Sequence, residues 1–377
     1  MSRREALVAV VVAFLVGLLA GGSLRPAREA TRSSGDATTS GPALRWRVTS
    51  AFGTHLPALG DNPIEVADRL RAATRGRIDW TVDDPGEVVP AFAIVDAVAK
   101  GKIEAGYTWL GYDQGRLAVS VLFGAVPFGM TPWEYTAWWV GGGGGELALE
   151  IYRPRGVEPI LCGMIGPETA GWFREAVDTP ADLEGLKIRF AGLGGRVLQR
   201  LGASVTMMPG GELFQALEKG AIDATEFSLP AVDERLGFDR VAAYNYFPGW
   251  HQPHTTFHLV VHKPTWDALP EADRATIELA CGNGVYRNFA RAEAGQGEVI
   301  EALASRGVAT RSLSPSLLGI LEGASNAVLE EEAAADEAFA RVLAHQRAFR
   351  ARYARWQALA YPSKAGPAQG GKETRGD

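Results

Sequence analysis

The sequence predicts an α/β fold of two lobes with a ligand-binding cleft between them. Strand-like segments alternate with helical segments along most of the chain, which is typical of largely parallel sheets covered by helices. The motif Lys-Gly-x-Ile-acidic-Ala occurs at Lys100–Ala105 and again at Lys219–Ala224. In both copies a helix ending in Lys-Gly is expected to lead into a strand, because lysine suits a helix C-terminus and glycine its left-handed cap. The recurrence indicates two lobes of similar design.

The first lobe opens with residues 44–50, in which apolar and polar side chains alternate as they do in a strand. Apolar residues between positions 63 and 73 recur at three and four, which predicts a helix. The same reasoning predicts strands over 78–82 and 103–109 and helices over 90–100 and 132–140. The five glycines Gly141–Gly145 lack the Lys-Ser/Thr of a phosphate loop, so a flexible turn is expected there.

The second lobe repeats this order of elements. Strands are expected over 187–191, 205–208, 222–227 and 255–261, and helices over 196–201 and 212–219. Residues 315–360 contain few helix breakers, with acidic residues leading and arginines trailing, as the helix dipole favours. This segment is expected to form a long C-terminal helix that spans both lobes.

The chain ends and the lobe boundaries follow from composition. Arg3 and Arg4 precede the uncharged apolar run Ala6–Ala20, which predicts an export signal or an uncleaved anchor over 1–24. The arginine pair leaves both the twin-arginine and the general export route open. The expected divisions are a flexible linker at 25–43, lobe I at 44–163 plus about 254–312, lobe II at 164–253 plus about 313–360, and a disordered tail at 361–377.

The charge balance narrows the classes of partner. The sequence has 38 Lys and Arg against 44 Asp and Glu, a net charge of −6, which argues against broad binding to nucleic acid. A small anion remains a suitable ligand, because one arginine suffices for it. Cys162 and Cys281 are too few for a metal knuckle, and we expect two separate buried thiols, with one bridge as the alternative in an exported protein.

Arg189 is the strongest candidate for ligand binding from the pattern alone. It lies near the end of an expected strand, where ligands bind in open α/β sheets, and it is followed by Gly192-Leu193-Gly194-Gly195. An arginine there could form a bidentate pair with a carboxylate or, equally, an ordinary ion pair with a protein side chain. The glycines do not follow the dinucleotide pattern G-x-G-x-x-G.

Two other groups of residues stand out. His251, His254, His258 and His262 are close in sequence, but no HExxH is present, and we expect three of them on the surface of a strand rather than around zinc. Tryptophans are frequent where the cleft and its walls are expected, at Trp109, Trp133, Trp138, Trp139, Trp172 and Trp250. No G-x-S-x-G motif supports serine hydrolase chemistry.

From about Trp46 to Trp356 the chain resembles the solute-binding proteins of TRAP (tripartite ATP-independent periplasmic) transporters of the DctP type. It is most similar to the branch that binds 2-oxo acids and related monocarboxylates. The segments that carry the resemblance are Glu87–Phe92 with Asp96–Val98, Ala125–Met130, Gly171–Phe173, Asp182–Arg189, Gly192–Gly195, Pro209–Glu212, Ile222–Glu226 and Tyr246–His251.

The resemblance implies the residues of the site. The family arginine that grips the ligand carboxylate corresponds to Arg189. The family glutamine and Glu-Trp pair that hold a cation correspond to Glu168, Glu226 and Phe227, so a Na⁺ or Ca²⁺ site over these residues is expected but placed in doubt by two changed residue types. Two carboxylates would favour Ca²⁺. The expected ligand-binding residues are Arg189, Glu168, Trp109, Tyr107, Phe92, Trp250 and His251.

The resemblance also implies a function. The expected protein is a periplasmic receptor that closes on a small organic acid and delivers it to the TRAP membrane permease, as a monomer or a homodimer. A periplasmic ligand sensor with the same fold is the alternative. An enzyme is not expected, because the sequence shows no assembled nucleophile and base.

Overall fold

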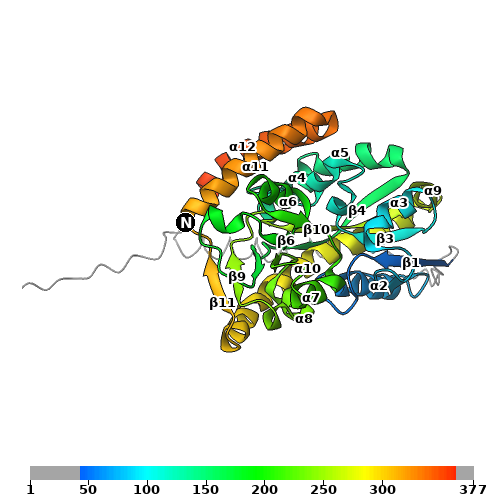
Figure 1. Cartoon of the computed structure of the whole chain (residues 1–377). Helices are drawn as coiled ribbons and strands as arrows, with labels where there is room; N and C mark the ends of the chain where they lie inside the picture. Colours follow the sequence, from blue (N-terminus) through cyan, green and yellow to red (C-terminus); the bar gives the residue numbers. More distant parts are fainter. Residues whose placement is uncertain (1–42, 362–377) are drawn as a thin grey trace, which may run out of the picture. The chain divides into compact units, whose positions relative to one another are not determined.

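The computed structural model describes residues 43–361, which form two β-sheets and the helices that cover them (Figure 1). The first sheet has the strand order β2-β1-β3-β10-β4. Its strands are β1 (Leu44–Ser50), β2 (Ile78–Asp83), β3 (Ala105–Thr108), β4 (Val157–Ile165) and β10 (Thr255–His262). β1 runs parallel to β2 and β3, whereas β10 runs antiparallel to β3 and β4. We call this sheet with its helices the first lobe.

The second sheet has the order β11-β9-β5-β8-β6-β7 and forms the second lobe. Its strands are β5 (Gly171–Phe173), β6 (Lys187–Arg189), β7 (Ser204–Thr206), β8 (Ala224–Thr225), β9 (Tyr244–Phe247) and β11 (Ala309–Ser312). β6 is parallel to β7 and β8, and β5 is antiparallel to β8 and β9. β11 pairs with β9, so residues Ala309–Ser312, which were expected in lobe I, belong to the second sheet.

Helices cover both sheets. They are α2 (Asp61–Ala73), α3 (Ile94–Ala99), α4 (Pro132–Gly141), α5 (Gly144–Tyr152), α6 (Gly192–Arg200), α7 (Gly210–Glu218), α8 (Pro230–Leu236), α9 (Lys263–Asp267), α10 (Glu271–Ser305), α11 (Pro315–Ala335) and α12 (Glu337–Ala360). The five-glycine run is shorter as a turn than expected, because α4 extends to Gly141 and α5 begins at Gly144.

The repeated motif performs the same task in each lobe. Gly101 and Gly220 adopt left-handed backbone conformations, with φ of 64° and 69°, just after α3 and α7. A side chain with a Cβ would be strained at either position, and glycine is not. Each glycine turns the chain toward a buried strand, β3 and β8 respectively, as the motif predicted.

The helix that spans both lobes is α10, and it lies earlier in the chain than expected. It packs on β4 and α2 of the first lobe and on α8 and β11 of the second. The segment expected to be one long helix is divided at Asp336, whose carboxylate accepts a hydrogen bond from Phe339 N at 2.7 Å and caps α12. α11 packs on α6 of the second lobe, whereas α12 packs on α4 and α5 of the first, so assigning all of 313–360 to lobe II was wrong.

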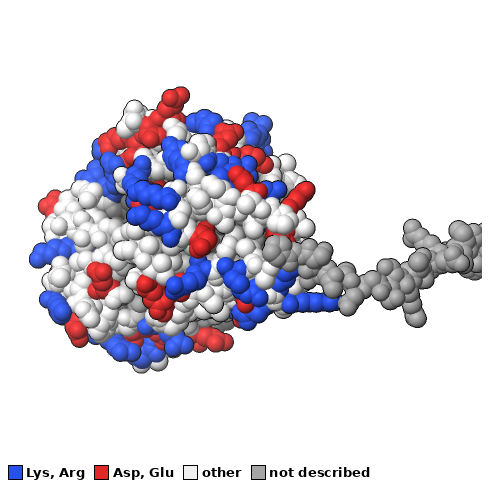
Figure 2. Space-filling view, turned by 90° about the vertical axis from the view of Figure 1, so that its right-hand side faces the viewer, with Lys and Arg blue, Asp and Glu red and all other residues white. Residues whose placement is uncertain are grey.

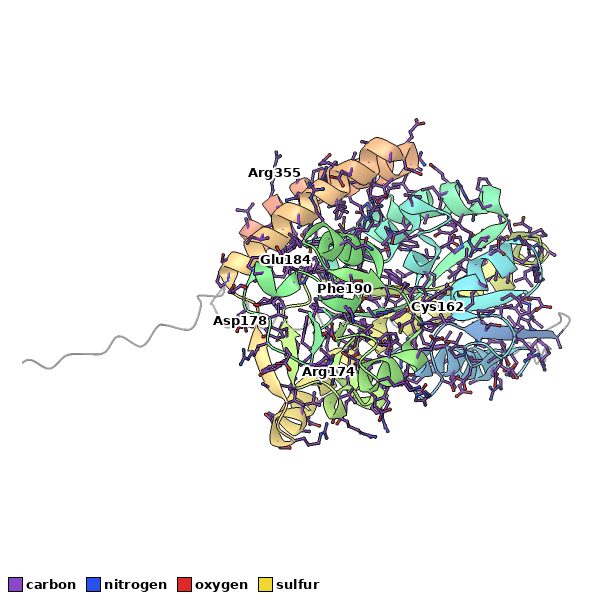
Figure 3. All side chains as sticks on the ribbon, viewed as in Figure 1. Cys162, Arg174, Asp178, Glu184, Phe190 and Arg355 are labelled. Carbon is purple, nitrogen blue, oxygen red and sulfur yellow. A yellow bond between two sulfur atoms is a disulfide. The ribbon has the colours of Figure 1, made fainter. Side chains whose placement is uncertain are left out.

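α10 is fixed to both lobes by specific bonds. A disulfide joins Cys162 of β4 to Cys281 of α10, so the expectation of two separate thiols was wrong and the alternative of one bridge is confirmed. Asn288 Nδ2 donates to Met164 O at 3.0 Å, again to β4. Further along α10, Gln296 Oε1 accepts a hydrogen bond from Ala231 N of α8 at 3.2 Å. Figure 3 labels Cys162 beside this helix.

Charged side chains of both signs are interspersed on the face shown in Figure 2. Ion pairs also join the exposed ends of charged side chains on different helices, such as Arg341 with Glu150 at 2.8 Å and Arg347 with Glu330 at 2.7 Å. This mixture agrees with the charge balance of the sequence.

Three expectations concern the chain ends. The export signal or anchor at 1–24, with its twin-arginine alternative, lies outside the described residues, as do most of the linker at 25–43 and of the tail at 361–377. Within residues 43–361, none of the helices has the length and apolar character needed to cross a membrane.

Candidate functional site

A small cavity lies between the lobes. One wall is aromatic and comes from the first lobe, with Phe52, Leu59, Trp109, Tyr112 and Phe257. The other wall is mainly polar and comes from the second lobe, the chain crossovers and the first residue of β10, with Glu168, Arg189, Ala191, Glu226, Phe227, Ser228, Gln252 and Thr255. A charged wall facing an aromatic wall suits a small ligand with one ionised and one apolar end.

Arg189 is the last residue of β6, and its side chain is only 1% exposed. Its Nη1 donates to Glu226 O at 2.7 Å and its Nε to Met208 O at 3.2 Å. The Phe227 ring lies 5.4 Å from the guanidinium carbon, near enough for a cation–π contact. These contacts fix the plane of the guanidinium beside the cavity.

Glu226 directly follows β8, the strand that pairs with β6, so the sheet places it beside Arg189. Its Oε1 accepts a short hydrogen bond from Ala191 N, and its Oε2 lies 3.0 Å from Arg189 Nη1. That second contact is an ion pair without hydrogen-bond alignment, and Oε2 has no hydrogen-bond partner within the described part of the chain.

Glu168 lies on the crossover from β4 to β5 and is 2% exposed. Its two oxygens accept hydrogen bonds from Thr255 Oγ1 and Gln252 Nε2, both at 2.7 Å. Burial, followed by repulsion from the Glu226 carboxylate, raises the pKa of Glu168 well above its usual value. A second positive charge in the cavity would therefore favour the ionised carboxylate.

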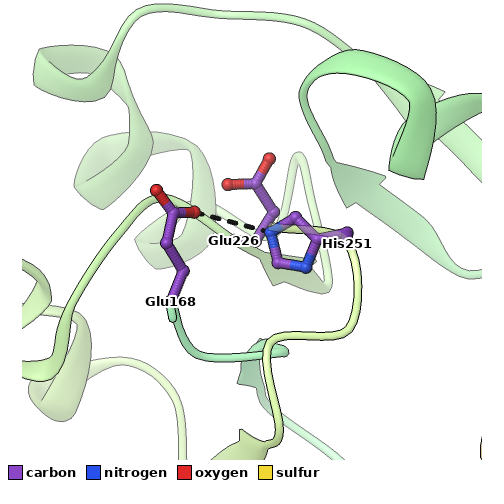
Figure 4. Close-up of side chains that lie close together, drawn as sticks. All are labelled: Glu168, Glu226 and His251. Atoms are coloured by element: carbon purple, nitrogen blue, oxygen red, sulfur yellow. Dashed lines mark ion pairs between the residues drawn. The ribbon is translucent and has the colours of Figure 1, made fainter. Parts of the chain in front are cut away.

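His251 completes a buried cluster with the two glutamates (Figure 4). One ligating atom from each of the three side chains lies within 4.8 Å of the others, and His251 Nε2 is 3.5 Å from Glu168 Oε2. Burial lowers the pKa of His251 to about 4, so its imidazole is neutral near pH 7. Among residues 43–361, neither ring nitrogen has a hydrogen-bond partner.

The donor set of this cluster fits a cation. Carboxylate oxygens are the ligands that Ca²⁺ prefers, and the neutral imidazole beside them adds no positive charge that would repel the cation. Unpartnered atoms, Glu226 Oε2 and the His251 nitrogens, are buried at the same place. Phe227 offers a ring beside Arg189 and no ligating side-chain atom, so a metal contact from this residue would have to use its backbone carbonyl.

The other expected ligand-binding residues divide into two groups. Trp109 lines the cavity, as expected. Tyr107 is buried in β3 instead, where its hydroxyl accepts a hydrogen bond from Asn62 at 2.8 Å. Phe92 packs behind Tyr112 with ring centres 4.8 Å apart, and Trp250 stacks on Phe190 at 5.8 Å. Tyr107 and Phe92 thus lie behind the aromatic wall, whereas Trp250 does not line the cavity.

The expectation of surface histidines on the strand was wrong for two residues. His254, just before β10, is 2% exposed and bonds Met130 O, and His258, within β10, is 0% exposed because that strand lies between β3 and β4. Their rings pack on Tyr135 and Trp139, at 4.4 and 5.1 Å. Only His262 of the strand histidines is partly exposed.

Sequence reasoning missed Phe52, Tyr112, Gln252 and Thr255 in the cavity walls. Gln252 and Thr255 follow His251 in a short polar run that leads into β10, a signal that could have indicated them. Tyr112 was harder to find, because it lies in a short 3₁₀ turn after β3 rather than in the strand.

A larger groove lies outside the cleft, between α4, α5, β4 and α10. Its lining is mostly apolar, with Trp133, Leu149 and Phe289 among its residues. The cluster of Arg189, Glu168 and Glu226 lies in the smaller cavity, so we place the candidate site there.

Comparison with known proteins decides the family. Residues 61–336 match the bacterial extracellular solute-binding proteins of family 7, the DctP family. The chain belongs to this family. A monocarboxylate 2-oxoacid-binding periplasmic protein of Nostoc sp. is 34% identical over 319 residues, which are 84% of this chain and 86% of that one.

Solved structures of DctP-type TRAP proteins agree with this assignment. A TRAP solute-binding protein from Bordetella bronchiseptica, a dimer with calcium and picolinate, has a TM-score of 0.83 at 30% identity, with 85% of this chain and 95% of that chain covered. One from Pseudoalteromonas atlantica with bound sodium and pyruvate has a TM-score of 0.81 at 32% identity, covering 84% and 97%.

The family assignment confirms the expected class of protein. DctP proteins are extracytoplasmic receptors of TRAP transporters, and their fold is the two-lobed α/β fold described above. The family and fold are those of solute-binding receptors rather than enzymes. The matches favour a transport receptor over the alternative of a ligand sensor.

Proposed function

We propose that this DctP protein captures a small monocarboxylate, a 2-oxo acid or hydroxy acid, together with a cation in the cavity between its lobes. The observation that carries the proposal is a buried arginine, Arg189, beside the buried cluster of Glu168, Glu226 and His251. A buried carboxylate ligand needs both a charge partner and hydrogen bonds, because desolvation otherwise outweighs its contacts.

Arg189 is the residue that would receive the ligand carboxylate. Hydrogen bonds to Glu226 O and Met208 O hold its guanidinium in place, so little side-chain entropy is lost on binding. Its planar donors match a carboxylate in a way that a lysine ammonium cannot. The aromatic wall of Phe52, Tyr112 and Phe257 would contact the apolar end of the ligand.

Glu168, Glu226 and His251 would hold the cation. When bound, a divalent cation would supply positive charge that neutralises the two glutamates and attracts an oxygen of the ligand. Without that charge, the paired carboxylates repel an anionic ligand. The two buried carboxylates favour Ca²⁺ over Na⁺, because their combined charge balances a divalent ion. Calcium and sodium occur with carboxylates in the related Bordetella and Pseudoalteromonas proteins, which supports this part of the proposal.

The remaining parts of the proposal concern transport. The lobes close on the ligand, and the closed receptor delivers it to the membrane permease of a TRAP transporter in the periplasm. The chain acts without catalysis, as a monomer or a homodimer; the dimeric Bordetella relative supports the second possibility. Closure adds contacts in only one state, so ligand binding shifts the population toward it.

Isothermal titration of the purified protein with pyruvate, with calcium or with chelator, tests the proposal. We expect pyruvate to bind in calcium. Arg189→Lys should weaken that binding by about 2 kcal/mol or more, because a lysine ammonium cannot donate two parallel hydrogen bonds to a carboxylate. Arg77→Lys is the matched control, since Arg77 also pairs with a carboxylate, Asp273, but lies away from the cavity. Equal affinities of wild type and Arg189→Lys would contradict the assignment of Arg189.

Mass spectrometry of small molecules released from the denatured protein identifies the natural ligand. The proposal requires a small carboxylate. Release of a neutral sugar or an amine, with no carboxylate, would overturn the ligand class while leaving the family assignment intact.

A further inference from the structure

The indole of Trp109 packs against two glycines of its own lobe, Gly111 and Gly124. Trp109 directly follows β3 and is 3% exposed. A Cβ on Gly111 would lie 2.2 Å from Trp109 Cη2, and a Cβ on Gly124 would lie 2.1 Å from Trp109 Nε1. Since real Cβ atoms do not approach so closely, only glycine at both positions admits the indole.

A third glycine meets the same indole from the second lobe. Gly192 begins α6, three residues after Arg189, and its Cβ would lie 2.9 Å from Trp109 Cη2 and 3.3 Å from Val121 Cγ2. The edge of the six-membered indole ring therefore touches the backbone of the opposite lobe. Any separation of the lobes at this point must break that contact.

The contact lies at the cavity itself. Trp109 lines the cavity with Arg189, and its ring packs edge-on against Tyr112 with ring centres 5.1 Å apart. Its indole Nε1 is buried and has no hydrogen-bond partner within residues 43–361. The indole thus gives packing rather than a hydrogen bond, and packing depends steeply on distance.

We propose that Trp109 and Gly192 form a latch that holds the lobes closed over a bound solute and sets how slowly the solute leaves. The proposal rests on the proposed function for the identity of the solute. Gly192 joins the latch to Arg189 through two residues of backbone, so the latch and the carboxylate site move together. Glycine is required at 192 because a methyl group there would keep the lobes apart.

Gly192→Ala tests the latch, with Gly185→Ala as its matched control. Both glycines have positive φ, 62° and 73°, so alanine introduces comparable backbone strain at each. A Cβ at Gly185 meets no atom of the described chain within 4 Å, whereas one at Gly192 meets Trp109. Titration with pyruvate in calcium should show affinity at least about tenfold weaker for Gly192→Ala than for Gly185→Ala, with the loss mainly in the dissociation rate.

Trp109→Phe provides the rescue. Phenylalanine lacks the indole atoms Cη2 and Cζ2 that face Gly192, so Gly192→Ala combined with Trp109→Phe should bind more tightly than Gly192→Ala alone. A merely structural role of Gly192 predicts additive losses instead. Additive losses, or equal affinity of Gly192→Ala and Gly185→Ala, would overturn the latch.

Amide hydrogen exchange with solute bound separates failure of the latch from failure of the proposed function. If the wild type does not bind pyruvate in calcium, the ligand class is wrong, and the small molecule released from the purified protein replaces pyruvate in this test. With solute bound, Gly192→Ala should speed exchange at residues 109–113 of the opposite lobe relative to Gly185→Ala. Equal exchange at 109–113 in the two solute-bound variants would overturn the latch.

Discussion

Replacing Glu168 with glutamine should stabilise the protein when no cation is bound and destabilise it when a cation is bound. The substitution preserves the volume of the side chain, and its carboxamide can still accept from Thr255 and, after a turn of the Gln252 amide, donate to Gln252. What it removes is one of two negative charges in a buried cluster. Ligating atoms of that cluster lie within 4.8 Å of one another.

The magnitude follows from this distance. Two unit charges 4.8 Å apart repel by about 3 kcal/mol at an effective dielectric constant of 20. In chelator at pH 8, Glu168→Gln should therefore raise the free energy of unfolding by up to about 3 kcal/mol. With saturating calcium the sign should change, because the wild type then has two carboxylates for the cation and the variant has one.

The pH dependence has a definite sign. The folded pKa of Glu168 is raised above the value of 4.5 for a free glutamate, so the folded state binds a proton that the unfolded state releases. In chelator, this residue should reduce the stability of the wild type progressively as pH rises above about 4.5. That component should be absent from Glu168→Gln.

Urea unfolding at pH 5 and pH 8, in chelator and in calcium, measures these differences. Glu184→Gln is the control for a general change of net charge, since Glu184 is exposed (Figure 3). If Glu168→Gln is less stable than the wild type at pH 8 in chelator, the two glutamates do not repel, and the reasoning fails.

Three further predictions concern the whole molecule. Arg189→Ala should lower the free energy of unfolding by about 3–5 kcal/mol as well as abolish binding, because Glu226 would remain as an unpaired buried charge; denaturant titration checks it, and wild-type stability would show that the pair is not buried in solution. Replacing both Cys162 and Cys281 with alanine should lower the free energy of unfolding by about 5 kcal/mol, since the bridge closes a loop of 119 residues. Reducing agent should destabilise the wild type but not the variant, and no effect on the wild type would show that the bridge does not form. Small-angle scattering should give a smaller radius of gyration with pyruvate and calcium, and identical curves under saturation would refute closure.

The sequence predicted several strands and helices of both lobes, such as β1, α2, β6 and α7, and it failed where packing overrides local signals. α10, a 35-residue helix with four glycines, was not among the predicted elements. One of them, Gly284, faces the first sheet so closely that a Cβ would lie 2.8 Å from Cys162 O. The glycine that weakens the helix locally is the one that lets it approach β4. The division at Asp336 was equally hidden, because it depends on a cap rather than on Gly or Pro.

The candidate site was predictable only in part. Arg189 was a candidate from its place at a strand end, and Glu168 and Glu226 were identified through the family resemblance. The second sheet brings Arg189 and Glu226 together because β6 and β8 are neighbours. Tyr107 was misplaced, because alternation shows that neighbouring residues face opposite sides of a strand without showing which side faces the cavity. His251 was expected to touch the ligand, but its place in a cluster with both glutamates requires the path of the crossover before β10.

The attachment of α10 has a mechanical consequence. Between Asn288, bonded to β4, and Gln296, bonded to α8, the helix passes from one lobe to the other within eight residues, or about 12 Å at the rise of an α-helix. The disulfide at Cys281 lies about two turns before this span. The helix is continuous from Glu271 to Ser305, so any rotation of one lobe against the other must bend α10 between the two attachments or break one of them.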